Sequence, residues 1–248
     1  MTNIDNAACL VTGASRGLGA SLARALDTRG ASLFLVARSA IVERYRDAQA
    51  VAADLSDPYS IDDLLDGFTR FVAERSPRCL LVLNNAGTVA PIAPAWRCDA
   101  GQVDAAIRLN LTAPMLVTGG FIRRFADADL PKLVVNVSSG AASTPYHGWS
   151  TYCAGKAGLD HFTRCAGLEQ RGAPHPATVI AIAPGVVDTA MQDAIRASDP
   201  ADFPQIGKFT ALKEGGKLAT PRDAAEAMIR LIETTPLQNG GVYDVRTR

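Results

Sequence analysis

Short apolar runs of strand length alternate with segments of helical periodicity along almost the whole chain. Compact apolar runs predict buried strands, whereas apolar positions spaced three and four residues apart predict amphipathic helices. We expect strands at residues 7–12, 32–37, 48–53, 79–83, 132–137, 178–183 and 241–245. We expect helices at residues 20–26, 61–72, 99–125, 150–172 and 221–232, with an irregular segment at 188–220. Pro114 is expected to kink the third helix, because its ring blocks a helical hydrogen bond.

This alternation predicts an α/β fold, a Rossmann-type doubly wound parallel sheet of about seven strands. Helices should cover both faces in a three-layer arrangement with right-handed connections. The segment between Arg38 and Asp54 is short for a full helix between two strands. No linker or change of composition divides the chain, so we expect a single domain over residues 1–248.

Composition narrows the classes of function. The 248 residues are 48% apolar and 20% charged with no net charge, which argues against a nucleic-acid partner. No signal peptide is visible and no apolar run approaches ~18 residues, so neither secretion nor a membrane partner is expected. Five scattered cysteines are typical of reduced thiols in a cytoplasmic protein. The three histidines lack metal-ligand spacing, so no metal site is expected.

A glycine-rich turn, Thr12-Gly-Ala-Ser-Arg-Gly-Leu-Gly19, joins the first strand to the first helix. A helix N-terminus offers unpaired N–H groups and a positive dipole, which suit a pyrophosphate. Glycines let the backbone approach such a ligand closely. An ordinary strand-to-helix turn is the alternative, but the position between strand and helix favours a dinucleotide.

The end of the second strand indicates which dinucleotide. No Asp or Glu stands at positions 36–39, where NAD-binding folds hold the ribose 2′-hydroxyl. Arg38, together with Arg16 of the glycine turn, suits the 2′-phosphate of NADP. The alternative is that both are surface charges. We favour NADP.

Tyr152 and Lys156 stand four residues apart in the fourth predicted helix, so they share one face. A nearby ammonium favours a phenolate, and we expect Lys156 to lower the pKa of Tyr152. An aromatic edge beside a solvated charge is the alternative. Ser139 and the Asn84–Gly87 and Pro184–Gly185 segments end neighbouring strands, so they should share the ligand-binding edge with Tyr152.

Taken together, these motifs resemble the classical short-chain dehydrogenase/reductase family over nearly the whole chain. The glycine turn, Asn84-Asn-Ala-Gly87, Asn110, the 13-residue interval from Ser139 to Tyr152, Tyr-x-x-x-Lys and Pro184-Gly-Val-Val-Asp-Thr189 carry the resemblance. It implies catalytic roles for Asn110, Ser139, Tyr152 and Lys156. It implies cofactor contacts for Gly13, Ser15, Arg16, Gly17, Leu18, Gly19, Arg38, Ser39, Asp54, Leu55, Asn84, Ala86, Gly87, Tyr152, Lys156, Pro184, Gly185, Val187 and Thr189.

The resemblance also implies a reaction, reversible hydride transfer between NADPH/NADP+ and a small-molecule carbonyl. Tyr152 would give the proton and Ser139 would hold the carbonyl oxygen. Lys156 would bond the nicotinamide ribose, and Asn110 would hold a water that resupplies the proton. A homodimer or homotetramer through helices 99–125 and 150–170 is implied as well.

A narrower resemblance links this chain to the sepiapterin and benzil reductases, through residues 184–192 and the ending Asn239–Asp244. It implies a ketone or diketone substrate. In this fold the segment after the sixth strand often forms a lid over the substrate, so we expect a substrate lid at about 188–220. The candidate substrate residues are His147, Trp149, Met191 and Asp244. For His147, a surface loop is an equal alternative.

Two other functions remain open at this point. A 3-oxoacyl-thioester reductase would show a basic patch for an acidic carrier, and the scattered residues Arg196, Lys208, Lys213 and Lys217 do not decide the matter. A non-catalytic NADP-binding sensor would have lost Ser139, Tyr152 or Lys156, and all three are present.

Overall fold

The structure is a computed structural model that describes residues 3–247. Its strands are β1 (Ala7–Thr12), β2 (Ser32–Ala37), β3 (Ala48–Ala52), β4 (Cys79–Asn84), β5 (Lys132–Val137), β6 (Ala177–Ala183) and β7 (Val242–Asp244). Its α-helices are α1 (Gly17–Thr28), α2 (Ser60–Ala73), α3 (Ala100–Ile107), α4 (Ala113–Arg124), α5 (Ser150–Glu169), α6 (Ala190–Arg196), α7 (Ile206–Glu214) and α8 (Pro221–Thr234).

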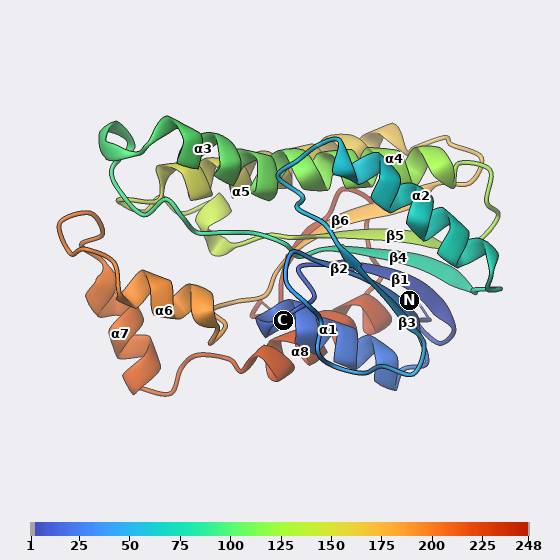
Figure 1. The fold of residues 1–248 in the computed structure, drawn as a ribbon, viewed down its shortest axis with the longest axis horizontal. Coiled ribbons are helices and arrows are strands. Elements are labelled where there is room, and N and C mark those ends of the chain that lie inside the picture. The colour runs from blue at the N-terminus through green and yellow to red at the C-terminus, as the bar shows by residue number, and fades with distance from the viewer. Residues whose placement is uncertain (1–2, 248) are drawn as a thin grey trace.

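All seven described strands are parallel and form one sheet in the order β3-β2-β1-β4-β5-β6-β7. Helices α2 to α5 cover one face, and α1 and α8 cover the other, as Figure 1 shows. The predicted three-layer Rossmann-type fold is therefore confirmed. The strand order reverses between β1 and β4, which is where ligands bind in sheets of this kind.

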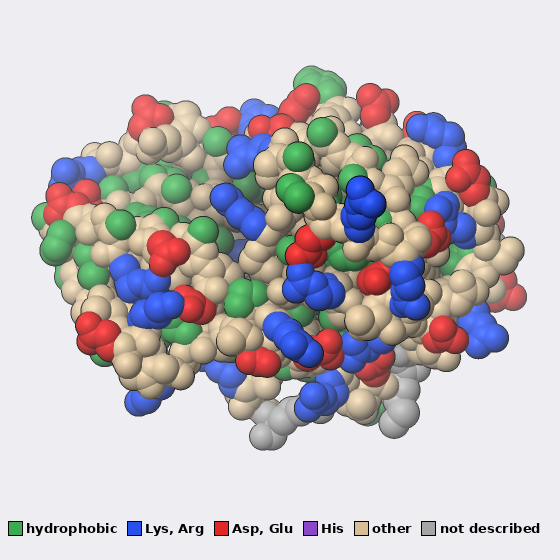
Figure 2. All heavy atoms as spheres, turned by 60° about the horizontal axis from the view of Figure 1, so that its bottom comes forward, with side chains coloured by type: hydrophobic (Ala, Val, Ile, Leu, Met, Phe, Trp, Pro, Cys, Tyr) green, Lys and Arg blue, Asp and Glu red, His purple; other side chains and the backbone are tan. Residues whose placement is uncertain are grey.

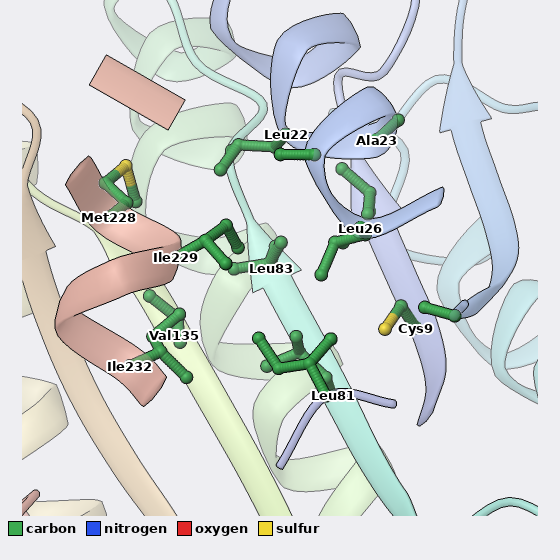
Figure 3. Close-up of a cluster of buried hydrophobic side chains, with 14 of the residues drawn as sticks. Cys9, Leu22, Ala23, Leu26, Leu81, Leu83, Val135, Met228, Ile229 and Ile232 are labelled. Carbon is green, nitrogen blue, oxygen red and sulfur yellow. The ribbon is translucent and has the colours of Figure 1, made fainter. Parts of the chain in front are cut away.

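The core lies on both sides of β4, whose residues are all buried. Side chains alternate along a strand, so Leu81 and Leu83 join the cluster beneath α1 and α8. Figure 3 shows Leu22 and Leu26 of α1 beside Ile229 of α8 in this cluster. On the opposite face, Leu80 and Val82 join a second cluster, which contains Phe34, Phe68, Phe71, Phe121 and Phe125.

The predicted long helix at 99–125 is interrupted where Pro114 led us to expect it. Residues Arg108–Thr112 form a turn of π-helix, and Pro114 stands in the first turn of α4. By length and composition alone, the continuous stretch Ala100–Arg124 is long and apolar enough to cross a membrane. Its Val117 and Phe121 are fully buried in the core, so packing against the sheet accounts for this composition.

The prediction that residues 188–220 are irregular was wrong. Two helices, α6 and α7, form there and extend from one end of the sheet (Figure 1). Their buried Ile195 and Phe209 pack with Phe203 against Trp149, and this tertiary contact stabilises helices too short to persist alone. The expected lack of a helix between β2 and β3 is confirmed.

Charges of both signs are mixed on the face formed by α1 and α8, which Figure 2 shows. Arg29 at the end of α1 donates to Glu226 and Glu233 of α8, at 3.0 Å and 2.8 Å. These partly exposed ion pairs join the two helices above the shared core.

Candidate active site

The glycine turn is held tightly against the end of β4. Gly13 has a φ of +68°, and a Cβ at Gly19 would lie only 2.1 Å from the Gly13 carbonyl oxygen. Thr12 Oγ1 accepts hydrogen bonds from the backbone N–H groups of Asn85 and Ala86 at 2.9 Å and 3.0 Å. The Asn85 side chain donates to the Thr12 carbonyl at 3.0 Å. The turn is thus closed by β4, and no acidic residue stands in the first turn of α1 to repel an anion.

An elongated cavity of about 750 Å³ runs along the carboxyl ends of the strands. Most of the expected cofactor residues line it: Gly13, Ser15, Arg16, Gly17, Leu18, Gly19, Arg38, Ser39, Leu55, Ala86, Gly87, Tyr152, Lys156, Pro184, Gly185, Val187 and Thr189. Its charged lining residues in the described chain are Arg16, Arg38, Lys156 and Arg246. A cavity with cationic and no acidic lining residues fits an anionic dinucleotide.

Two expected cofactor residues, Asn84 and Asp54, do not line this cavity. The side-chain amide of Asn84 is buried and donates to Asn136 Oδ1 at 2.9 Å and to Thr118 Oγ1 at 3.2 Å. Because side chains alternate along β4, Asn84 faces the layer of α4 and α5. The neighbouring Asn85, which sequence reasoning missed, lines the cavity instead.

The Asp54 carboxylate accepts hydrogen bonds from the backbone N–H and hydroxyl of Ser56, at 2.9 Å and 2.8 Å. These bonds, with a smaller contribution from Arg38, lower the pKa of Asp54. The Arg38 guanidinium lies 3.8 Å from this carboxylate and is largely exposed. Beside it, the hydroxyls of Ser39 and Ser15 lie 3.0 Å apart and join the end of β2 to the glycine turn.

Ser139 and Tyr152 meet at the other end of the cavity. Ser139 follows β5 and caps a short 3-10 turn, where its Oγ accepts from the Ala141 N–H at 3.2 Å. Its hydroxyl is near enough to that of Tyr152, which α5 presents from its first turn, to lower the pKa of the phenol. Tyr152 is buried, and Trp149 packs edge-on against its ring at 5.6 Å.

Lys156 is buried one turn further along α5, and its ammonium donates to the Val137 carbonyl at 2.8 Å. Burial lowers the pKa of Lys156 to about 8, an effect that the nearby Asp160 carboxylate opposes. Burial raises the pKa of Tyr152, whereas its bond with Ser139 lowers it. The expected lowering by Lys156 is absent, because the ammonium lies 6.0 Å from the centre of the Tyr152 ring and points to Val137.

Asn110 lies in the π-helical turn and is fixed by the backbone of Thr88. Its Oδ1 accepts from the Thr88 N–H at 2.9 Å and its Nδ2 donates to the Thr88 carbonyl at 2.8 Å. A Cβ at Gly87 would lie 2.9 Å from Asn110 Oδ1 and 3.8 Å from Lys156 Nζ. Both polar atoms therefore border the same narrow space, although Asn110 does not line the main cavity.

Of the four expected substrate residues, Trp149 and Met191 line the cavity and His147 and Asp244 do not. His147 is exposed at the surface of its loop. The Asp244 carboxylate is turned to Arg246, whose Nε and Nη2 lie 2.9 Å and 2.5 Å from its two oxygens. Arg246 lines the cavity in its place, and no motif in the sequence pointed to it.

The apolar wall at this end comes from residues far apart in sequence. Trp149 stacks on Phe203 with ring centres 4.7 Å apart and contacts Phe209 at 5.3 Å. Tyr146 lies over the same indole at 4.9 Å. The site therefore combines a hydroxyl pair, a buried ammonium and an aromatic wall.

Comparison with known proteins identifies the family. The family model for short chain dehydrogenases matches residues 7–200. The chain belongs to the short-chain dehydrogenase family. Members of this family use NAD(P)(H), and this chain is an oxidoreductase that acts between alcohol and carbonyl groups.

Similar proteins align with nearly the whole length of this family member. Benzil reductase ((S)-benzoin forming) of Bacillus cereus is 35% identical, over 95% of this chain and 98% of the relative. Sepiapterin reductase of Rattus norvegicus is 31% identical, over 96% of this chain and 95% of the relative. These matches agree with the narrower resemblance noted from the sequence.

Two solved structures show the same fold. The crystal structure of the KRED1-Pglu enzyme has a TM-score of 0.80 at 29% identity, covering 95% of this chain and 99% of that one. A putative NAD(P)-dependent gluconate 5-dehydrogenase from Beutenbergia cavernae, with bound NADP, has a TM-score of 0.78 at 25% identity. It covers 98% of this chain and 97% of its own.

Proposed function

We propose that this dehydrogenase is an NADPH-dependent reductase of neutral aromatic ketones or diketones. The observation that carries the proposal is one cavity with two different ends. Arg16 and Arg38 stand at one end, and Ser139, Tyr152 and Lys156 meet at the other beside an aromatic wall. The benzil and sepiapterin reductases among its relatives support a carbonyl substrate.

The glycine turn would hold the pyrophosphate, and Arg16 and Arg38 would hold a 2′-phosphate at the end of β2. No acidic side chain of the described residues lines that part of the cavity to hold a ribose 2′-hydroxyl. The NADP in the structure from Beutenbergia cavernae is consistent with this preference.

When bound, NADPH supplies a hydride to the carbonyl carbon of the substrate. Tyr152 then gives its phenolic proton to the carbonyl oxygen, and its raised pKa keeps that proton in place at neutral pH. The Ser139 hydroxyl hydrogen bonds the same oxygen as negative charge develops. Lys156 would bond the nicotinamide ribose, and Asn110 would hold the water that returns the proton.

Two alternatives are less well supported. A thioester reductase needs free cations for an acidic carrier, yet two of the four candidate cations are paired, Lys213 with Asp188 at 2.5 Å and Arg196 with Asp193 at 2.5 Å. Lys208 donates to the Tyr146 hydroxyl at 3.1 Å. A sensor without chemistry gives no reason for a hydroxyl pair beside a buried ammonium.

We further propose a cytoplasmic homodimer or homotetramer. The five free cysteines support a reducing compartment. Met115 and Leu116 on α4 and Leu168 on α5 are exposed apolar residues, and they lie on the two helices that the family resemblance puts at an interface.

The test is NADPH oxidation at 340 nm with benzil, sepiapterin and an acetoacetyl thioester, with NADH in parallel. Turnover of benzil or sepiapterin with NADPH is expected. Tyr152→Phe should lose about 100-fold or more in turnover and keep NADPH binding, because only the proton donor is removed. Retained turnover in that variant, or turnover of the thioester alone, would refute the proposal.

A further inference from the structure

Arg246 reaches the substrate end of the cavity from just beyond β7. Its aliphatic part lies over Gly185, where a Cβ would stand 3.3 Å from Arg246 Cδ. Its Nη2 would stand 3.7 Å from a Cβ at Gly140, the residue after Ser139. The side chain therefore spans the turns at Gly185 and Gly140, and Gly140 directly follows Ser139.

The Asp244 carboxylate fixes this guanidinium and compensates its charge. It accepts from the Arg246 backbone N–H at 2.8 Å as well as from Nε and Nη2. These bonds lower the pKa of Asp244, so the carboxylate stays ionised. Within residues 3–247, Nη1 donates to no protein acceptor, which leaves a fixed donor edge on a neutral pair.

The other cations of the cavity have different surroundings. Arg16 stands at the start of α1 and Arg38 at the end of β2, whereas Lys156 is buried with the Val137 carbonyl as its partner. Arg246 is thus the charged residue of the described lining that stands next to the turn after Ser139, and its side chain, although paired with Asp244, is about half exposed.

We infer that Arg246 donates a hydrogen bond to the second carbonyl oxygen of a neutral 1,2-dicarbonyl substrate, while Ser139 and Tyr152 act on the first. This inference rests on the proposed function and narrows its substrate class. An isolated guanidinium favours a carboxylate, but Asp244 already takes that place. A neutral acceptor adds to the pair without displacing it, and the aromatic wall formed by Trp149 suits the rings of a diaryl diketone.

The test compares benzil with deoxybenzoin, which has the same two rings and lacks the second carbonyl. Arg246→Met should lower the ratio of kcat/KM for benzil over deoxybenzoin about 10-fold, because it removes a charge-assisted hydrogen bond that only benzil makes. Both substrates are measured on one preparation, so partial unfolding of the variant cancels in the ratio. Arg230→Met, on the exposed side of α8, should leave the ratio unchanged.

Two further variants separate donation from bulk charge. Arg246→Lys keeps the positive charge but replaces the planar guanidinium by a single ammonium. Its benzil-to-deoxybenzoin ratio should therefore lie between those of Arg246→Met and the wild type. Asp244→Asn leaves the guanidinium uncompensated, so turnover of benzoylformate should rise relative to benzil. The inference would be overturned if Arg246→Met left the benzil-to-deoxybenzoin ratio unchanged. It would also be overturned if the variant bound NADPH with a larger dissociation constant than the wild type.

The same ratio can be read without turnover. Dissociation constants for benzil and deoxybenzoin are measured in the NADP+ complex of wild-type and Arg246→Met protein. If the wild-type protein shows no turnover but binds benzil more tightly than deoxybenzoin, and Arg246→Met loses this difference, the proposed function is refuted and this inference is supported. If the enzyme is active but shows no binding preference that depends on Arg246, the proposed function is supported and this inference is refuted.

Discussion

Replacing Arg38 by Ala should separate NADPH from NADH. In the proposed complex the guanidinium faces the 2′-phosphate, which NADH lacks, so the variant should weaken NADPH alone. Arg38 is 67% exposed at its side chain and lies 3.8 Å from Asp54, so its field is partly screened and partly compensated. A water-like dielectric is therefore the appropriate limit.

The magnitude follows from Coulomb attraction. A unit charge and a phosphate dianion about 5 Å apart attract by about 1.7 kcal/mol in water. This lies within the range of about 1.5–3 kcal/mol for hydrogen bonds to charged groups. We expect Arg38→Ala to lower kcat/KM for NADPH about 15-fold, at about 1.4 kcal/mol per factor of ten. The effect should shrink as salt is added.

The assay is steady-state kcat/KM with each cofactor at saturating benzil. Arg46→Ala is the matched control, because Arg46 lies on the same β2–β3 connection, is 62% exposed and pairs with Asp27 away from the cavity. Its cofactor ratio should equal that of wild type. An equal loss with NADPH and NADH in Arg38→Ala, or a wild-type preference for NADH, would refute the reasoning.

Three other predictions concern the proton supply, the core and the assembly. The pKa of Lys156 is lowered to about 8, so its ammonium is present below that pH and lost above it. The value of kcat/KM should therefore fall as the pH rises through about 8. Asp160→Asn should move this fall to lower pH, because the Asp160 carboxylate raises the pKa of Lys156. If the fall stays at the same pH in this variant, Asp160 does not influence the group that titrates. Phe68→Ala removes a ring that packs against four others, and urea unfolding should show a loss of about 3–5 kcal/mol, whereas a loss under 1 kcal/mol would mean that the core refills the space. Leu116→Glu on α4 should yield a smaller species in light scattering, and an unchanged mass would place the interface elsewhere.

The features that the sequence predicted best are those encoded by a few neighbouring residues. All seven strands were expected within one or two residues of their observed bounds, because each is a short apolar run between polar turns. The glycine turn and the Tyr152–Lys156 pair were likewise visible as patterns of a few residues. The helices α6 and α7 were missed, because they depend on Phe203 and Phe209 packing against Trp149, which lies far earlier in the chain.

The site shows the same division. The motifs located the edge of the sheet, but they did not show which of two neighbouring asparagines faces the ligand. Asn84 faces the core, and Asn85 faces the cavity. They placed Asp244 in the pocket, whereas its carboxylate pairs with Arg246, and Arg246 lines the cavity. They expected Lys156 to govern the pKa of Tyr152, whereas burial raises it.

The sequence by itself therefore determined the order of strands and helices, the parallel sheet and the set of residues near the ligand. These follow from periodicity and turn chemistry, which act over a few neighbouring residues. The tertiary structure decided which side chains face the cavity, which charges are compensated and which pKa values move. Those properties depend on burial and on contacts between residues distant in the chain, and local spacing does not encode them.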